Sequence, residues 1–515
     1  MLSGLFGKKT DHPMASMKSV QALLDDLPRN DAFKLVMELT EWIEAVSGNP
    51  DFKLDHQFAV ICLLDESVQP YLRKLVREYF TPHELSKFQA NRLWMLLNNF
   101  SCHIAKAYYT LFTRYCNGEK GSGAIKTQLP MLVARTINTM ATQSKYICVR
   151  YGQINKELWM NLWQLYAHAE SFQYLDTPVN LYPGPTNNTT VKRELGHLAG
   201  WYGSGVNTMT PLNMHLTDRI VAHFSSAIEI QAGQSGQSLF AFDLNRPTAP
   251  TRVNVNAAAS SSTRYLGMAD MQVALQNLLK MLDKGVVPGE LNLSGSYDAE
   301  IVKNAVRYLL NYFAAPPVRR NARRGIKVNL NVVNGFVELV ERTDVGLNFG
   351  EEKSALWMIE DISANGFCTL LPTQAGEAIR IGSLFGIQPD GVKHWGVAVA
   401  RRLMRNEESQ LRLGAAILAN RIAGITLTQS GGMGGGNFTD GQAALWLYAK
   451  AGEPSGEVSL LMKADTYSPS RSLQTMLDGK SYLLIPNGLQ ERGPDYELVK
   501  FRVIEQEASS VEESY

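Results

Sequence analysis

Two short polar motifs carry most of the chain's potential for binding chemistry. The first is a cluster of arginines directly after a Pro-Pro break, made of Arg319, Arg320, Arg323 and Arg324. The second follows further along the chain with the spacing D-x-S-x-x-G and consists of Asp361, Ser363 and Gly366. Guanidinium groups bind phosphate oxygens through paired hydrogen bonds, and a small polar turn offers carboxylate and hydroxyl groups. Together they predict a site for a compact, phosphate-rich ligand and not a catalytic centre.

The arginine cluster taken alone fits three interpretations. A solvated charge run needs no function at all. An arm that binds nucleic acid would be longer and would carry interleaved aromatic residues, which this segment lacks. A ligand clamp is chemically apt, because one arginine can hold a phosphate while its neighbour stacks on a purine face.

The D-x-S-x-x-G motif also has an ordinary explanation, since aspartate, serine and glycine form common turns. Its placement between two β-like segments, 357–360 and 367–371, is more informative. This placement puts Asp361 and Ser363 at the end of a strand. A carboxylate there can accept both N–H groups of a guanine edge, while a serine hydroxyl can bond a phosphate or a base.

No assembled catalytic or metal centre is visible in the sequence. The nine histidines are scattered without an H-E-x-x-H motif, and no G-x-S-x-G elbow is present. The glycine tract at 431–436 lacks the G-K-[ST] ending of a phosphate-binding loop. We therefore expect a protein that is not an enzyme and has neither cofactor nor metal, with histidines that serve the structure.

Composition bounds the class of protein. The length of 515 residues allows two to four domains of roughly 100–200 residues each. A net charge of +1 gives no argument for a nucleic-acid binder, and we expect no nucleic-acid partner. The five cysteines form no C-x-x-C pair and predict buried free thiols in a reducing compartment. No signal peptide is visible, and no stretch approaches the ~18 apolar residues of a membrane span, so we expect a cytoplasmic protein.

Hydrophobic periodicity predicts a multidomain α+β chain with a helical N-terminal region and a β-rich C-terminal half. Apolar residues recur three and four apart in the first half, whereas short alternating segments and frequent glycines follow Pro317. The expected order is a flexible N-terminus (1–29), a helical domain (30–175), a mostly helical domain or continuation (191–314), a small antiparallel β-barrel (316–428), a further β-rich block (441–504) and an acidic tail (505–515).

The barrel segment with its two motifs resembles the PilZ domain family. That family is marked by R-x-x-x-R in an arm before the barrel and by [D/N]-x-S-x-x-G on the barrel. Arg320 and Arg324 fit the first motif with Arg319 as the preceding arginine, and Arg319 with Arg323 is a second admissible register. Two departures are Gly325, where an apolar residue is common, and a long stretch at 335–353, which suggests an enlarged hairpin.

The resemblance implies a receptor for the bacterial second messenger cyclic di-GMP. It implies that arm arginines and the Asp/Ser/Gly strand end grip the dinucleotide, and that ordering of the arm reorients the attached helical region. The expected ligand set is therefore Arg319, Arg320, Arg323, Arg324, Asp361, Ser363 and Gly366. A protein partner that contacts the helical region is implied as well. The alternative is a PilZ-like structural adaptor that acts through protein contacts without ligand. The 441–504 block forms either a second barrel or the completion of the first.

Overall fold

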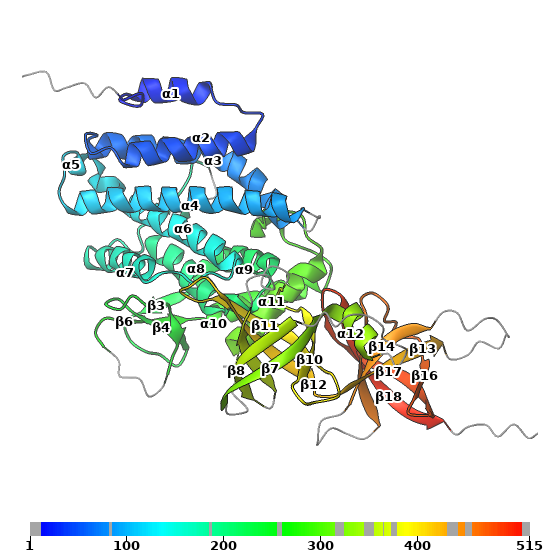
Figure 1. Cartoon of the computed structure of the whole chain (residues 1–515). Helices are drawn as coiled ribbons and strands as arrows, with labels where there is room; N and C mark the ends of the chain where they lie inside the picture. The colour runs from blue at the N-terminus through cyan, green and yellow to red at the C-terminus, as the bar shows by residue number, and fades with distance from the viewer. Residues whose placement is uncertain are drawn as a thin grey trace, which may run out of the picture. The chain divides into compact units, whose positions relative to one another are not determined.

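The chain folds into two compact units, one up to residue 317 and one from residue 318 onward (Figure 1). The computed structural model describes residues 12–81, 85–184, 188–254, 260–314, 324–343, 355–363, 365–371, 379–429, 441–448 and 456–506. The predicted fold class is confirmed: helices fill the first unit and antiparallel β-barrels the second.

The first unit is a stack of helices that pack on their sequence neighbours. Its helices are α1 (Met17–Asp25), α2 (Ala32–Ser47), α3 (Leu54–Phe80), α4 (Lys87–Cys116), α5 (Ser122–Ile125), α6 (Leu129–Val149), α7 (Lys156–Ser171), α8 (Val191–Gly203), α9 (Pro211–His223), α10 (Ala269–Leu282) and α11 (Ala299–Ala314). Local signals set several starts. Asp31 accepts a hydrogen bond from the backbone N–H of Lys34, and Ser86 forms a capping box with Gln89.

The prediction of a flexible stretch over residues 1–29 was wrong for residues 17–25, which form α1. Ser16 caps this helix through the backbone N–H of Ser19. Val20 and Leu24 are buried against the rest of the unit, so a helix with one apolar face docks there. Residues 1–11 lie outside the described residues.

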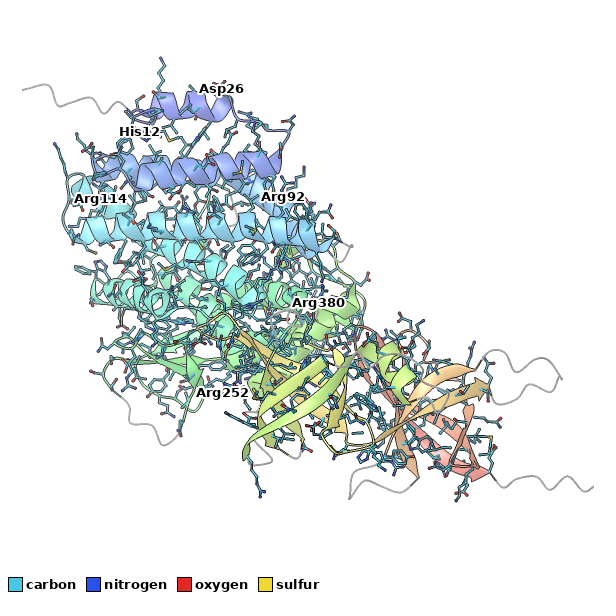
Figure 2. All side chains as sticks on the ribbon, in the orientation of Figure 1. His12, Asp26, Arg92, Arg114, Arg252 and Arg380 are labelled. Carbon is cyan, nitrogen blue, oxygen red and sulfur yellow. The ribbon has the colours of Figure 1, made fainter. Side chains whose placement is uncertain are left out.

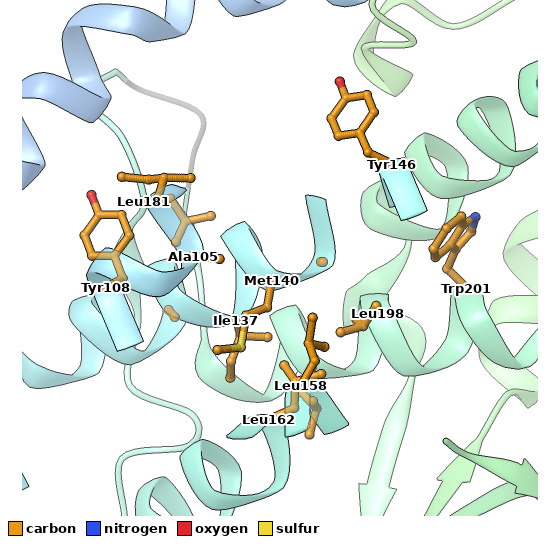
Figure 3. Close-up of a cluster of buried hydrophobic side chains, with 14 of the residues drawn as sticks. Ala105, Tyr108, Ile137, Met140, Tyr146, Leu158, Leu162, Leu181, Leu198 and Trp201 are labelled. Atoms are coloured by element: carbon orange, nitrogen blue, oxygen red, sulfur yellow. The ribbon is translucent and has the colours of Figure 1, made fainter. Parts of the chain in front are cut away.

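One continuous apolar core runs through the first unit, as Figure 3 shows for its central part. Tyr108 of α4, Ile137 of α6 and Leu162 of α7 project into it in that view. Trp159 and Trp163 of α7 are buried in this core and stack on each other.

A four-stranded sheet closes one end of the first unit. Its strands run in the order β3 (Glu229–Gln231), β6 (Thr263–Gly267), β4 (Ser238–Asp243) and β5 (Thr251–Arg252). Strands β4 and β5 pair antiparallel. Arg252, labelled in Figure 2, donates to the carbonyl of Tyr312 in the last turn of α11 and lies over the Phe240 ring.

The second unit consists of two closed, six-stranded barrels. The first barrel has the order β10-β11-β12-β9-β8-β7, formed by β7 (Arg324–Asn334), β8 (Ala355–Ser363), β9 (Gly366–Leu370), β10 (Leu384–Pro389), β11 (Gly396–Arg405) and β12 (Leu411–Ala419). The second barrel has the order β13-β14-β15-β18-β17-β16, formed by β13 (Ile422–Gln429), β14 (Gln442–Leu447), β15 (Glu457–Lys463), β16 (Leu473–Leu477), β17 (Lys480–Arg492) and β18 (Tyr496–Gln506).

The C-terminal block therefore forms a barrel of its own, and two expectations need correction. Strand β13 lies within the range predicted for the first barrel (316–428) but pairs with β14 and β16 of the second. The stretch after β7 is more than an enlarged hairpin, because it contains helix α12 (Gly335–Thr343). The predicted tail lies outside the described residues from 507 onward.

Helix α12 joins the two barrels through apolar packing and a hydrogen bond. Phe336 and Leu339 of α12 enter an apolar cluster with Val397 of the first barrel and Leu445 of the second. The carboxylate of Asp495, in the β17–β18 turn, accepts a hydrogen bond from the backbone N–H of Phe336 at 2.7 Å. The two barrels therefore share an apolar cluster and the helix that Asp495 caps.

Candidate ligand site on the first barrel

The D-x-S-x-x-G motif forms the tight connection between β8 and β9. Asp361 and Ser363 lie at the C-terminal end of β8, and Gly366 is the first residue of β9. Arg324 is the first residue of β7. The other predicted clamp residues, Arg319, Arg320 and Arg323, lie outside the described residues.

Asp361 belongs to a row of residues that crosses the outer surface of the barrel. Paired residues in a sheet share a face, and Asp361 pairs with Gly325 on one side and Cys368 on the other. Cys368 pairs in turn with Gly414, and Gly414 with Arg402. The row therefore carries the Asp361 carboxylate near one end, Arg402 at the other end, and Cys368 and Gly414 between them.

Two shifts in strand register set the direction of the Asp361 side chain. The pairing of β8 with β9 shifts between Ile359 and Asp361, and the pairing of β7 with β8 shifts between Gly325 and Val328. Bulges of this kind re-aim side chains and are frequent beside binding sites. The strand alternation that buries Trp357 and Ile359 ends at this point.

The other two motif residues hold the connection together. The Ser363 hydroxyl donates to the backbone carbonyl of Gly366 at 3.1 Å. Gly366 packs so closely on β12 that a methyl group there would overlap the carbonyl oxygen of Ala415. Ser363 and Gly366 therefore stabilise the connection whether or not a ligand binds.

Arg324 does not face Asp361. It pairs with Ile362, and Ile362 pairs with Phe367, whose side chain is only 1% exposed inside the barrel. Rows alternate between the two faces of a sheet, so the row of Arg324 faces away from the row of Asp361. The structure brings Asp361, Ser363 and Gly366 together and leaves Arg324 exposed on the other row.

Sequence reasoning missed three residues beside the motif. The Arg412 guanidinium lies 2.9 Å from the Glu360 carboxylate and donates to the Cys368 sulfur at 3.1 Å. Burial raises the pKa of the Cys368 thiol, and the charge of Arg412 opposes that rise. Arg412 sits on β12, far from the motif in sequence, and no spacing signal connects them. Only strand pairing reveals the neighbourhood.

A buried ionic cluster in the first unit was missed as well. The Lys145 ammonium group lies 2.8 Å from Asp218 Oδ2 and 2.8 Å from His215 Nδ1, and His197 Nε2 lies 2.8 Å from Asp218 Oδ1. Burial would raise the pKa of Asp218, but Lys145 and His197 hold it well below its usual range. Burial and then the nearby Lys145 charge hold the pKa of His215 well below its ordinary value.

The contacts of His215 agree with the structural role expected for the histidines. His215 Nε2 lies 2.9 Å from the carbonyl oxygen of Leu293, and its ring stacks on Phe80 with centroids 4.1 Å apart. Because the backbone carbonyl can only accept, Nε2–H donates and Nδ1 accepts from Lys145. Every polar atom of the ring has a partner, so His215 serves the structure.

Three further observations concern the described residues only. No His/Cys/Asp/Glu group among them has the arrangement to hold a metal ion. None of their helices combines the length and apolar character needed to cross a membrane. The five cysteines, all of which are described, are free thiols, and Cys116 is exposed where a buried thiol was expected.

Comparison with known proteins gives one match. Residues 18–235 match the family described as "Cyclic-di-GMP receptor FimW, N-terminal domain". The match indicates a cyclic di-GMP receptor; it covers most of the first unit, less than half of the chain, and neither barrel. No curated protein and no solved structure matches the chain.

Proposed function

We propose that this chain is a cyclic di-GMP receptor whose first barrel is PilZ-like and binds the dinucleotide on its outer face. Two independent lines support the proposal. The first unit matches a family described as a cyclic di-GMP receptor domain, and the barrel carries D-x-S-x-x-G after an arginine cluster. The match lies in one unit and the motifs in the other.

The observation that carries the proposal is the position of Asp361. Its bulge places a half-buried carboxylate on the same outer face as Ser363 and Gly366. A carboxylate can accept both N1–H and N2–H of a guanine, and a guanine offers no other pair of adjacent donors. The arm arginines Arg319, Arg320 and Arg323 would supply phosphate contacts and base stacking, and Arg324, on the other row, would contribute less.

The structure of α11 supports transmission from the arm to the helical unit. This helix ends at Ala314, shortly before the arginine cluster, and buries Val302, Leu309 and Phe313 in the core of the first unit. The carbonyl of Tyr312 in its last turn accepts from Arg252. A helix held this firmly does not move alone, so ordering of the arm would reorient the whole helical unit.

The output of such a receptor is a changed protein contact. We propose that a protein partner binds the helical unit, that the chain acts as a receptor and not as an enzyme, and that it works in the cytoplasm, where a second messenger acts. The alternative is a PilZ-like adaptor that works without ligand. The structural roles of Ser363 and Gly366 are the observation that favours this alternative.

Isothermal titration of the full chain with cyclic di-GMP separates the two. The receptor predicts saturable binding, and cyclic di-AMP serves as the control because adenine lacks the N1–H and N2–H donors. Small-angle scattering of the saturated protein should then differ from that of the free protein. Absence of any binding would leave the adaptor as the function.

A further inference from the structure

A pocket in the first unit lies between the C-terminal ends of α4 and α7 and the short helix α5. It has a volume of about 490 Å³. Small-molecule sites occupy roughly 300–1,000 Å³, so the pocket is large enough for a metabolite. The 3₁₀ turn Lys126–Gln128 after α5 completes the wall. The lining includes Tyr115, Cys116, Gly123, Lys126, His168 and Phe172.

The Phe172 ring forms an aromatic platform on one wall of this pocket. It is 68% exposed, although phenylalanine side chains are usually buried. The ring stacks on the His168 imidazole with centroids 4.4 Å apart and an angle of 27° between the planes. His168 is held in turn by an edge contact with Phe112 and by a hydrogen bond of 2.7 Å between its Nδ1 and the Tyr174 hydroxyl. The other face of the Phe172 ring is therefore presented by a fixed support to a further planar ring.

The charge of the lining is positive and comes from one side chain. Lys126 is exposed, and within the described part of the chain its ammonium group forms neither an ion pair nor a hydrogen bond. Partial burial raises the pKa of the Cys116 thiol and lowers the pKa of His168, so both groups are neutral at neutral pH. None of the described residues that line the pocket is acidic. The pocket therefore favours a ligand that carries an anionic group.

An exposed aromatic face beside a single cation is complementary to a planar ring that bears one anionic group. Nucleoside phosphates combine the two, because the base stacks on aromatic side chains and the phosphate pairs with lysine. We propose that this pocket binds a purine nucleoside monophosphate, with its base on Phe172 and its phosphate at Lys126. The described lining residues include no carboxylate or side-chain amide to read a base edge, so guanine and adenine should be accepted alike. The pocket uses no residue of the barrel motif, so it is a site separate from the one proposed for cyclic di-GMP.

Gly123 allows the pocket to be filled without a change in the fold. A Cβ built on Gly123 meets nothing within 4 Å, so Gly123→Leu places its side chain in open space. Gly289 also has open space at its Cβ position and does not line the pocket, so Gly289→Leu is the matched control. Phe172→Ala and Lys126→Ala remove exposed side chains. All four variants should therefore keep the melting temperature of the wild type.

Isothermal titration of the full chain with GMP and with AMP tests the assignment, together with a melting curve for each variant. We expect saturable binding of both nucleotides, with affinities within about threefold of each other. Phe172→Ala should weaken binding about five- to a hundredfold, the range for one base stacked on an aromatic ring. Gly123→Leu should remove binding and Gly289→Leu should retain it. Lys126→Ala should weaken GMP binding about two- to fivefold, and guanosine should bind the wild type more weakly than GMP by a similar factor.

Four results would overturn the assignment. If the wild type binds neither GMP nor AMP saturably, the pocket is not a nucleotide site. If Gly123→Leu or Phe172→Ala binds GMP like the wild type, the nucleotide binds elsewhere. If guanosine binds as tightly as GMP, the ligand is not selected for its anionic group. If Asp361→Ala loses GMP binding while Gly123→Leu retains it, the barrel binds the nucleotide, and the pocket assignment fails while the proposed function stands.

Discussion

Arg324 and Asp361 lie on neighbouring strands of the first barrel, one residue out of register, so that their side chains leave opposite faces of the sheet. Arg324 pairs with Ile362, and the partner of Asp361 is Gly325. The Arg324 side chain could therefore contact a ligand on the Asp361 face only by passing around the end of the strand. We expect Arg324→Ala to change cyclic di-GMP affinity by less than about threefold, which is under 1 kcal/mol.

The remaining arm residues give the comparison for that prediction. Arg319→Ala, Arg320→Ala and Arg323→Ala, titrated in parallel, should include the variant with the largest loss among the arm arginines. A loss of more than tenfold in Arg324→Ala would show instead that the register with Arg320 and Arg324 is the clamp.

Substitution of Gly366 should lower the stability of the fold even in the absence of ligand. A side chain there would meet the Ala415 carbonyl, so Gly366→Ala forces β9 away from β12 and should cost about 1–3 kcal/mol of unfolding free energy. Gly325→Ala is the matched control, because nothing lies within 4 Å of the position where its Cβ would be. Denaturant unfolding should place the control within about 0.5 kcal/mol of wild type. Equal effects of the two variants would refute the steric argument.

Glu491 holds the barrels together through two partners. It accepts from Arg401 and, at 2.8 Å, from the buried hydroxyl of Tyr496. Because the Arg401 side chain is 42% exposed, solvent screens the ion pair to about 1 kcal/mol or less. The orphaned Tyr496 hydroxyl adds about 1–2 kcal/mol, so Glu491→Ala should lower the unfolding free energy by about 2 kcal/mol.

An exposed ion pair on the second barrel calibrates that effect. Lys480 and Glu505 lie 2.7 Å apart with both side chains more than half exposed. Lys480→Ala should stay within about 0.5 kcal/mol of wild type in the same thermal melt. If Glu491→Ala melts like Lys480→Ala, the ion pair does not join the barrels.

The neutral state of His215 predicts a pH dependence for the first unit. The folded protein holds the pKa of His215 well below its ordinary value, first through burial and then through Lys145. The unfolded chain takes up a proton below pH about 6.5, so it binds more protons there than the folded state. Stability should therefore fall as the pH drops below about 6.5, by at most about 1.4 kcal/mol per pH unit for this group.

A second histidine provides the control for the pH series. His215→Gln should flatten the dependence between pH 7 and pH 5 in thermal melts, since its amide does not titrate in this range. His223, exposed at the end of α9, is the comparison, and His223→Gln should retain the wild-type slope. Equal slopes in wild type and His215→Gln would exclude His215 as the source.

Periodicity and local signals in the sequence predicted most helices and the barrel strands. The capping box of Ser86 with Gln89 involves residues three apart, and the alternation from Trp357 to Ile359 spans three residues. Signals this short can be recognised in the sequence alone. Helix α12 had a visible pattern too, in Phe336 and Leu339, but its cap comes from Asp495 across the barrel interface.

What could not be predicted depends on pairing between distant strands. The bulges beside Asp361 and at Arg401 arise from register, and register decides which side chains share a face. Membership of β13 in the second barrel is likewise a matter of pairing. The motif therefore predicted Asp361, Ser363 and Gly366 as neighbours, but nothing in its spacing pointed to Arg402, Gly414 or Arg412.

The central claim is that the Asp361 face of the first barrel binds cyclic di-GMP. Titration calorimetry on wild type and Asp361→Ala, with melting curves for both, tests it most directly. The account predicts saturable binding by wild type, a loss of at least about tenfold in Asp361→Ala and the same melting temperature. Wild-type affinity retained in a folded Asp361→Ala protein would contradict it and would place any binding site elsewhere in the chain.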